Sequence, residues 1–226
     1  MRKMNRFFKK QLLFRVNLGC GQSPTKGWRN FDNSLSLRLS CIPLLSKVLL
    51  AIGFLDKAQY EFIAFSRRNK IEFADVIKGI PIADGSVEVL YCSHLIERFD
   101  CYDVDLFMKE AQRVLCVGGI LRLAIPDLKK QAMDYIKSND ANQFMKALMV
   151  TGSKPRSMAQ KFKILTLGTR QLLWRYDEDS LRQILQAYNF NNVFLLQVGE
   201  TTISRPEPLD LSERSEESIY IEATKL

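Results

Sequence analysis

A glycine turn directly follows the first strand that the sequence predicts. Residues 12–18 form a short apolar run, and Gly19, Cys20 and Gly21 come immediately after it. Glycine has no Cβ atom and tolerates unusual backbone dihedral angles, so a strand followed by Gly-x-Gly lets the backbone approach a ligand closely. The turn is therefore a candidate binding site. The alternative is a turn that only joins two elements.

The spacing beyond this turn argues against a dinucleotide site. The dinucleotide pattern requires a third glycine at position 24, where the chain has Pro24. It also places an acidic residue about 20 residues beyond the turn. Here Asp32 follows Gly19 by 13 positions. The sequence therefore disfavours NAD(P) as the ligand.

The elements that must position these residues form an alternating pattern. Apolar runs bounded by turn residues predict further strands at 28–32, 71–75, 87–92, 120–125, 194–198 and 218–223. Helical spacing predicts a helix over 104–115, ended by Gly118 and Gly119, and another over 178–187, capped by Asp177. Strands that alternate with helices indicate an α/β fold with a doubly wound, mainly parallel sheet, in one domain over residues 1–226.

Three segments depart from this pattern. Residues 35–70 carry apolar residues at helical spacing where a plain α/β unit needs only a short connection, so we interpret them as a helical insertion or cap. Residues 127–170 are polar and mostly helical by pattern. Residues 201–217 are rich in Pro, Ser, Glu and Arg, and are the one segment expected to be loosely ordered.

Composition excludes several classes of site. The five cysteines are odd in number and show no C-x-x-C spacing, which argues against a disulfide framework and against zinc, and fits a reducing cytoplasm. His94 is the only histidine, so a multi-histidine metal site cannot form, and no metal is expected. No secretory signal and no transmembrane helix are predicted. The expected location is the cytoplasm.

The net charge of +8 is concentrated in the first third of the chain. Residues 1–70 hold 14 Lys and Arg against 3 Asp and Glu, which gives +11, whereas residues 71–226 hold 19 against 22, which gives −3. The charge fits a solvated face, or attraction to an anionic membrane surface or anionic substrate. No nucleic-acid motif accompanies it, so no nucleic-acid partner is expected.

A series of short motifs, taken in order, narrows the interpretation further. The motifs are Leu18-Gly-Cys-Gly21, Gly27-Trp-Arg-Asn-Phe-Asp32, Ala74-Asp75, Gly79-Ile-Pro-Ile-Ala-Asp-Gly-Ser86, Tyr91-Cys-Ser-His-Leu-Ile-Glu97, Glu110-Ala-Gln-Arg-Val-Leu-Cys-Val-Gly-Gly119, Ile120-Leu-Arg-Leu-Ala-Ile-Pro-Asp127 and the tail Glu217-Ser-Ile-Tyr-Ile-Glu-Ala223. With these motifs the sequence resembles class I S-adenosylmethionine-dependent methyltransferases of the methyltransferase type 11 group, in particular members found in bacterial surface-polysaccharide gene sets. The resemblance covers most of the chain except residues 1–10 and 35–70.

The resemblance implies a seven-stranded sheet with the last strand antiparallel, and a binding site for S-adenosylmethionine. Asp32 would accept hydrogen bonds from the ribose hydroxyls, because a carboxylate offers only acceptors. Asp75 and Val76 would meet the adenine edge. The other implied cofactor-binding residues follow the first and fourth strands, and are Asn17, Gly19, Cys20, Gly21 and Ser93. Asn17 is a departure, since many relatives have an acidic residue there.

Two residues are the candidates for catalysis. His94, past the fourth strand, and Asp127, at the end of the fifth, could act as a general base for the acceptor. A structural histidine is the alternative for His94. Relatives often read His-x-x-Glu-His, but here Arg98 stands in place of the second histidine. Residues 174–176 are either an acceptor wall or part of the core.

The sequence thus predicts transfer of a methyl group from S-adenosylmethionine to an oxygen or nitrogen of a small-molecule or saccharide acceptor, with S-adenosylhomocysteine as the other product. A non-catalytic methyltransferase-like partner protein is the alternative. The insertion at 35–70 has three interpretations: a cap on its own domain, a dimer surface, or a helix on a membrane surface. The last would make the protein peripheral to the inner face of the membrane.

Overall fold

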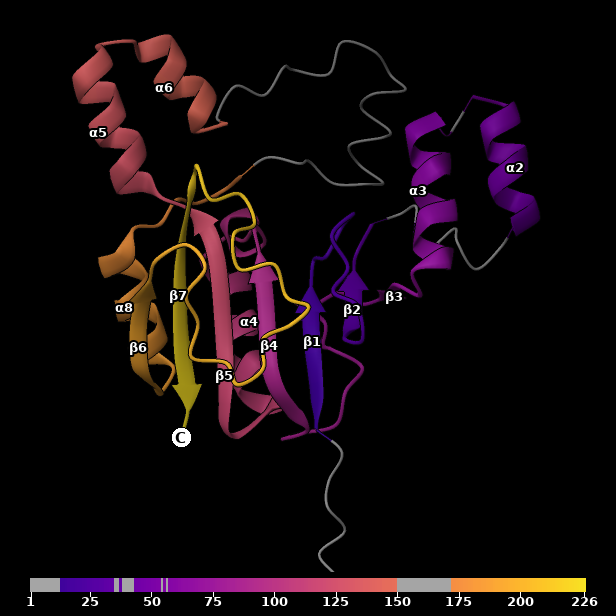
Figure 1. Ribbon diagram of the computed structural model, residues 1–226. Coiled ribbons are helices and arrows are strands. Elements are labelled where there is room, and N and C mark those ends of the chain that lie inside the picture. The colour runs from indigo at the N-terminus through magenta and orange to yellow at the C-terminus, as the bar shows by residue number, and fades with distance from the viewer. Residues whose placement is uncertain (1–12, 35–36, 38–42, 54, 56, 150–171) are drawn as a thin grey trace, which may run out of the picture.

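The computed structural model of the chain describes residues 13–34, 37, 43–53, 55, 57–149 and 172–226 (Figure 1). Its centre is a seven-stranded sheet in the order β3-β2-β1-β4-β5-β7-β6. Strands β1 to β5 run parallel to one another, and β7 is antiparallel to both β5 and β6. The strands are β1 (Phe14–Leu18), β2 (Arg29–Asp32), β3 (Glu72–Phe73), β4 (Val87–Ser93), β5 (Leu115–Pro126), β6 (Phe190–Leu196) and β7 (Ser218–Lys225). The predicted Rossmann-like sheet with an antiparallel last strand is confirmed.

Two helices, α4 (Cys101–Val114) and α8 (Glu178–Ala187), lie against one face of this sheet. Each presents an apolar stripe to the strands, including Phe107 and Ala111 from α4 and Leu181 and Leu185 from α8, all fully buried. These side chains pack against buried Val16, Leu90 and Leu123 and their neighbours. The main hydrophobic core therefore lies between the sheet and these two helices.

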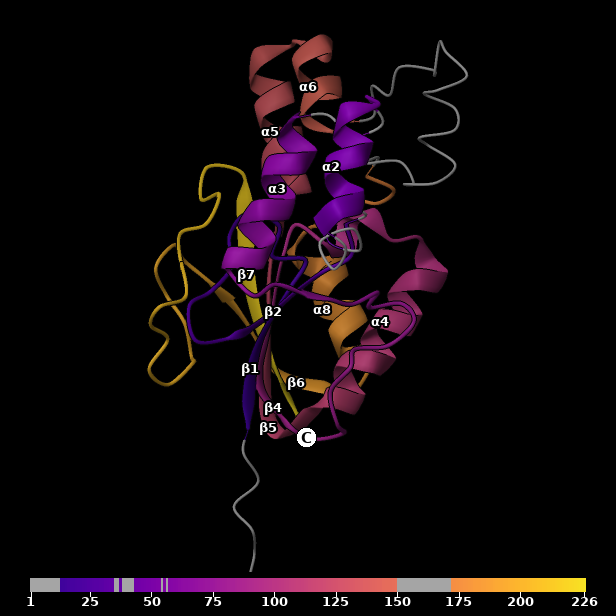
Figure 2. The same cartoon turned by 90° about the vertical axis from the view of Figure 1, so that its right-hand side faces the viewer.

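The opposite face of the sheet is covered by the segment between β6 and β7, residues 197–217 (Figure 2). Ile203 and Leu209 from this segment are buried in a second apolar cluster with Trp28 and Tyr220. Glu213 fastens the segment further, because its carboxylate accepts a hydrogen bond of 2.7 Å from the Tyr91 hydroxyl. The expectation that residues 201–217 are loosely ordered is therefore wrong.

Several predicted boundaries also move. Helix α4 begins at Cys101 rather than 104, because the Asp100 side chain caps it by accepting from the Asp103 amide at 2.8 Å. It ends at Val114, and the two glycines taken as its stop lie inside β5. A Cβ atom on Gly119 would lie 2.9 Å from the Cys116 carbonyl oxygen, so the strand admits only glycine there. Asp177 caps α8 as predicted.

In the described part of the chain, four helices stand beyond the carboxyl ends of the parallel strands, in two pairs (Figures 1 and 2). The predicted helical insertion contains α2 (Pro43–Ala51) and α3 (Lys57–Arg68), between β2 and β3. The predicted helical segment after β5 contains α5 (Leu128–Ser138) and α6 (Ala141–Ala147), and its remaining residues 150–170 lie outside the described ranges. Among the described helices, none is long and apolar enough to cross a membrane.

Candidate functional site

The carboxyl ends of β1, β2, β3 and β4 meet at one edge of the sheet and bring most of the predicted cofactor residues together. Leu18 pairs with Phe31 of β2 on one side and with Cys92 of β4 on the other. Asp32 pairs with Phe73 of β3. The glycine turn, Asp32, Asp75 and Ser93 therefore all begin from the same edge, which is where open α/β sheets bind ligands.

The glycine turn has a backbone that side chains rarely tolerate. Gly19 has φ +66°, and a Cβ atom there would lie 3.1 Å from the Leu95 side chain. At Gly21, with φ +50°, a Cβ atom would approach only the Gly19 carbonyl oxygen, at 4.0 Å, so this side of the turn is open. Cys20 between them is buried, and burial raises the pKa of its thiol to about 12, which keeps it protonated. The turn therefore offers backbone rather than side-chain groups to a ligand.

Asn17 organises the loop that follows the turn. Its side chain is buried, and its Nδ2 atom donates to the Ser23 carbonyl oxygen at 3.0 Å and to Thr25 Oγ1 at 3.1 Å. A carboxylate could not make the first of these bonds, because it has no hydrogen to donate. Asn17, which stands where many relatives have an acidic residue, thus serves here as a hydrogen-bond donor to the loop.

Asp32 holds the end of β2 against the glycine turn. Its Oδ2 atom accepts from the Gly21 amide at 3.2 Å and its Oδ1 atom from the Ser34 amide at 2.8 Å. A carboxylate has about four acceptor positions, so roughly two remain after these bonds. The side chain is only partly buried. Asp32 therefore has the capacity and the exposure to accept hydrogen bonds from the hydroxyls of a ribose.

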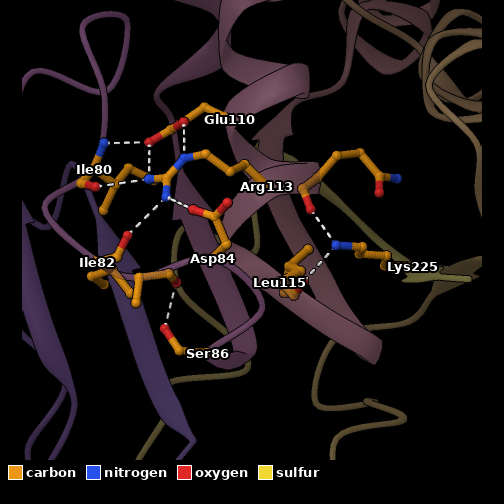
Figure 3. Close-up of polar contacts among 10 residues, drawn as sticks. Ile80, Ile82, Asp84, Ser86, Glu110, Arg113, Leu115 and Lys225 are labelled. Atoms are coloured by element: carbon orange, nitrogen blue, oxygen red, sulfur yellow. Dashed lines mark hydrogen bonds and ion pairs between the residues drawn. The ribbon is translucent and has the colours of Figure 1, made fainter.

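Asp75 and Val76 follow β3, and a network of polar contacts holds the loop after them to α4 (Figure 3). Glu110 accepts from the Ile80 amide at 2.5 Å and from Arg113 at 2.6 Å, and the Arg113 guanidinium also donates to the Ile80 and Ile82 carbonyl oxygens. Arg113 and Glu110 thus form an ion pair on α4.

The two residues before this loop differ in exposure. The Asp75 carboxylate is 16% exposed and forms an ion pair of 3.3 Å with Lys78, so it lies within reach of a ligand. Val76 is buried in the main core. Ser93, at the end of β4, has a buried hydroxyl that makes no hydrogen bond within the described part of the chain.

His94 and Glu97 form a buried pair just beyond β4. His94 has φ +48°, and its Nε2 atom lies 2.8 Å from Ser218 Oγ, while its Nδ1 atom lies 3.5 Å from Glu97 Oε1. Burial, reinforced by Arg214, Arg98 and Arg175, lowers the pKa of the imidazole to about 3. Burial raises the pKa of the Glu97 carboxyl to about 7. At neutral pH the histidine is uncharged and Glu97 is the group that titrates.

A small cavity of about 80 Å³ opens beside this pair. It is bounded by Pro126 at the end of β5 and by side chains from several segments that are distant in the sequence. Those with polar groups are His94, Glu97, Arg98, Gln131, Arg175, Arg214 and Glu217. Sequence reasoning did not select Gln131, Arg214 or Glu217 for the site. Of the predicted acceptor wall at residues 174–176, only Arg175 lines the cavity.

Asp127, the second candidate for catalysis, lies next to this cavity in the chain but caps a helix. Its Oδ1 atom accepts from the Lys130 amide at 3.2 Å, at the start of α5, and the residue is not among those that bound the cavity. Asp127 pairs with Tyr176 in an isolated β-bridge. The three residues of the predicted acceptor wall have different environments: Tyr176 is buried in the core, Trp174 is 56% exposed, and Arg175 lines the cavity.

Comparison with known proteins agrees with this arrangement. Residues 55–123 match the family model described as "Methyltransferase domain" (Methyltransf_11). The fold is similar to that of a SAM-dependent methyltransferase from Methanosarcina mazei, with a TM-score of 0.52 and 13% identity over 96% of this chain and 94% of that one. It is also similar to a SAM-dependent methyltransferase from Thermotoga maritima described as a "possible histamine N-methyltransferase", with a TM-score of 0.50 and 14% identity over 94% and 83%. No curated protein matches the sequence.

At these identities the similarity to solved structures establishes the fold. The fold is that of SAM-dependent methyltransferases, and residues 55–123 match a methyltransferase family model. Together they support a methyltransferase enzyme that uses S-adenosylmethionine as its cofactor.

Proposed function

We propose that the protein transfers a methyl group from S-adenosylmethionine to an oxygen or nitrogen of a small-molecule or saccharide acceptor, at the carboxyl edge of its sheet. The observation that carries this proposal is the placement of two neighbouring sites along one edge. The open glycine turn with Asp32 lies at the ends of β1 and β2, and the cavity beside His94 lies at the ends of β4 and β5.

The residues at the first site fit the cofactor. The open side of the Gly19–Gly21 turn suits its methionine part, the free acceptor capacity of Asp32 suits the ribose, and the exposed edge of Asp75 suits the adenine amine. The unpartnered hydroxyl of Ser93 lies between this site and the cavity, at the end of β4. When bound, the cofactor supplies an electrophilic methyl group, and the protein aligns the acceptor with it.

The residues at the second site can take up the proton that the acceptor loses on methylation. His94 is neutral near pH 7, and its Nε2 atom is engaged with Ser218. Glu97, with a pKa near 7, is the group in the cavity wall that can take up a proton at that pH and release it again. We propose that Glu97 and His94 act together as the proton acceptor. Asp127 remains the second candidate, through a side chain that now caps α5.

Calorimetric titration with S-adenosylmethionine tests the first site. Asp32→Ala removes the ribose contacts, each a charge-assisted hydrogen bond, and we expect affinity to fall by at least about tenfold. Asp179→Ala, an exposed aspartate at the start of α8, is the matched control and should bind like wild type. Because Asp32 also holds the turn, Asp32→Asn is a second variant, which keeps one carbonyl oxygen. Wild-type protein without measurable affinity would remove the enzyme proposal.

Transfer of labelled methyl groups into glycan and small-molecule extracts tests the reaction itself. Wild type should label a product and Asp32→Ala should not. Cofactor binding without transfer into any fraction would favour the non-catalytic partner protein instead. Label in glycan fractions would support the link to surface polysaccharides.

We further propose that the helical segment at 35–70 contacts the inner face of an anionic membrane, with the protein in the cytoplasm. Leu44 and Val48 of α2, and Ile52 directly after it, follow one another at intervals of four residues and are 74%, 48% and 69% exposed. Residues 1–70 carry a charge of +11, which favours an anionic surface.

Flotation with vesicles that contain about one third anionic phosphatidylglycerol tests this contact. Replacing Leu44, Val48 and Ile52 together by serine should abolish binding. Val117→Ser removes an equally exposed apolar side chain, from the start of β5, and should leave binding unchanged. Wild-type protein that does not float, or a triple variant that floats as well as wild type, contradicts the membrane contact.

A further inference from the structure

Three arginines from separate parts of the chain surround the cavity beside His94. Arg98 follows β4, Arg175 precedes α8, and Arg214 lies in the segment before β7. All three contribute to lowering the pKa of the His94 imidazole, so each acts electrostatically on the same small volume. The wall of the cavity therefore carries three cationic side chains.

The carboxylates of the cavity do not balance these charges. Glu217 forms an ion pair of 2.6 Å with Arg214. Glu97 has a pKa near 7 and is only partly ionised at neutral pH. Within the described ranges, neither Arg98 nor Arg175 has a carboxylate at ion-pair distance. Arg98 makes one long hydrogen bond, of 3.4 Å, to the His94 carbonyl oxygen. Two guanidinium groups thus face the cavity without a close ion pair, although Glu97 and Glu217 act electrostatically on Arg175 from a greater distance.

Arg175 has the strongest requirement for a partner. Its Nη2 atom donates to the Ala147 and Leu148 carbonyl oxygens, which fixes the guanidinium in place at the end of α6. Its Nε and Nη1 atoms are buried and make no hydrogen bond within the described part of the chain. Burial also lowers the pKa of this guanidinium. Buried donors on a charged group are costly unless a ligand satisfies them.

Unsatisfied acceptors line the same cavity. Glu97 Oε2 and Gln131 Oε1 are buried, and within the described ranges neither has a hydrogen-bond partner. The Glu97 side chain is only 2% exposed. Acceptors of this kind suit a hydroxyl or amine hydrogen. The cavity therefore combines unmatched cationic donors with unmatched acceptors.

We propose that the methyl acceptor carries an anionic group, a phosphate or a carboxylate, which Arg175 and Arg98 bind. Its hydroxyl or amine end lies toward Glu97 and Gln131. This inference rests on the proposed function for its biological meaning, but the binding of an anion does not depend on that function. Arginine suits both anions, because its fork of N–H groups matches their oxygen atoms.

Titration of the full chain with inorganic phosphate and, separately, with glucuronate tests the binding and distinguishes the two anions. We expect saturable binding of at least one of them, weakened at least about tenfold in Arg175→Gln, since a charge-assisted contact is lost. Arg98 is exposed, so Arg98→Gln leaves the fold intact and should weaken binding too. Arg182→Gln, on α8, is the matched control with the same change of charge and should bind like wild type.

Equal affinity in wild type, Arg175→Gln and Arg98→Gln, or no saturable binding of either anion, overturns the proposal. A second measurement separates it from the proposed function. Extracts labelled by methyl transfer are divided by anion exchange, and the label should lie in the anionic fraction. Label confined to the neutral fraction overturns the anionic acceptor and leaves the methyltransferase proposal intact. A protein that binds the anion but not S-adenosylmethionine contradicts the methyltransferase proposal and leaves the anion site intact.

Discussion

Burial acts in opposite directions on the two titratable side chains at the end of β4. The His94 imidazole loses basicity and stays neutral, whereas the Glu97 carboxyl loses acidity and titrates near pH 7. The desolvation of the charged form is the main cause in both cases. This difference is why the proton-accepting role shifts from the histidine, which its residue type favoured, to the glutamate three residues further on.

Glu97 should leave a signature in the pH dependence of stability. Its pKa is raised in the folded state, so the folded protein binds more protons than the unfolded chain between about pH 4.5 and about pH 7. Its contribution to stability is therefore present at low pH and is lost as pH rises through about 7. Relative to wild type, Glu97→Gln should gain stability on the order of 2 kcal/mol from about pH 5 to about pH 8.

Urea unfolding of both proteins at the two pH values measures this change. His94 is present in both, so its opposite contribution largely cancels in the difference. Glu178→Gln, a partly exposed glutamate of α8, should show no such trend. A stability difference between Glu97→Gln and wild type that does not change with pH would show that Glu97 is ionised in the folded state throughout.

At the scale of elements, the sequence predicted those parts of the site that depend on neighbours in the chain. The glycine turn and Asp32 lie at the ends of apolar runs, and a parallel sheet brings such ends to one edge. The start of α4 was missed although its signal, the Asp100 cap, is local. Gly118 and Gly119 were interpreted as the end of a helix, because glycine is common just after helices. In the structure they lie in β5, where the pairing with β4 is irregular.

The cavity could not be predicted in this way. Gln131, Arg175 and Arg214 belong to separate segments, and only tertiary packing brings them together. Composition also misled, since residues 201–217 are polar and rich in proline. Their order comes from two buried apolar side chains, Ile203 and Leu209, and from long-range hydrogen bonds that leave no pattern in the sequence.

The contacts of Arg113 make a prediction at this scale (Figure 3). Its guanidinium donates five hydrogen bonds, two to Glu110 within α4 and three to the loop that follows Asp75, at Ile80, Ile82 and Asp84. Arg113→Ala also leaves Glu110, which is 13% exposed, without its ion-pair partner. Because Arg113 itself is about a third exposed, we expect a loss of only about 2 kcal/mol in unfolding free energy.

Thermal and urea unfolding measure this loss, and calorimetry should show weaker binding of S-adenosylmethionine because the loop next to Asp75 loosens. Lys109→Ala, an exposed residue on the same helix, serves as the control and should change stability by less than about 0.5 kcal/mol. If Arg113→Ala matches this control in stability, the network does not hold the loop.

At the scale of the whole molecule, a buried ion pair connects the centre of the sheet to the segment that covers it. Arg122 of β5 and Glu222 of β7 are 2.6 Å apart and almost completely buried. Arg122 also donates to the Glu200 carbonyl oxygen, and Glu222 accepts from the Thr201 and Thr202 side chains. Two strands and the start of the covering segment thus share one polar cluster inside an apolar face.

This cluster predicts strong coupling between the two charges. Arg122→Met leaves the Glu222 carboxylate buried without its cation, and we expect a loss of about 3 to 5 kcal/mol. Adding Glu222→Gln to that variant removes the uncompensated charge, while the Gln carbonyl oxygen can still accept from Thr201 or Thr202. The double variant should therefore be more stable than Arg122→Met alone. Urea unfolding of the four proteins of this cycle measures the coupling, and losses that simply add would mean that the two charges do not stabilise each other.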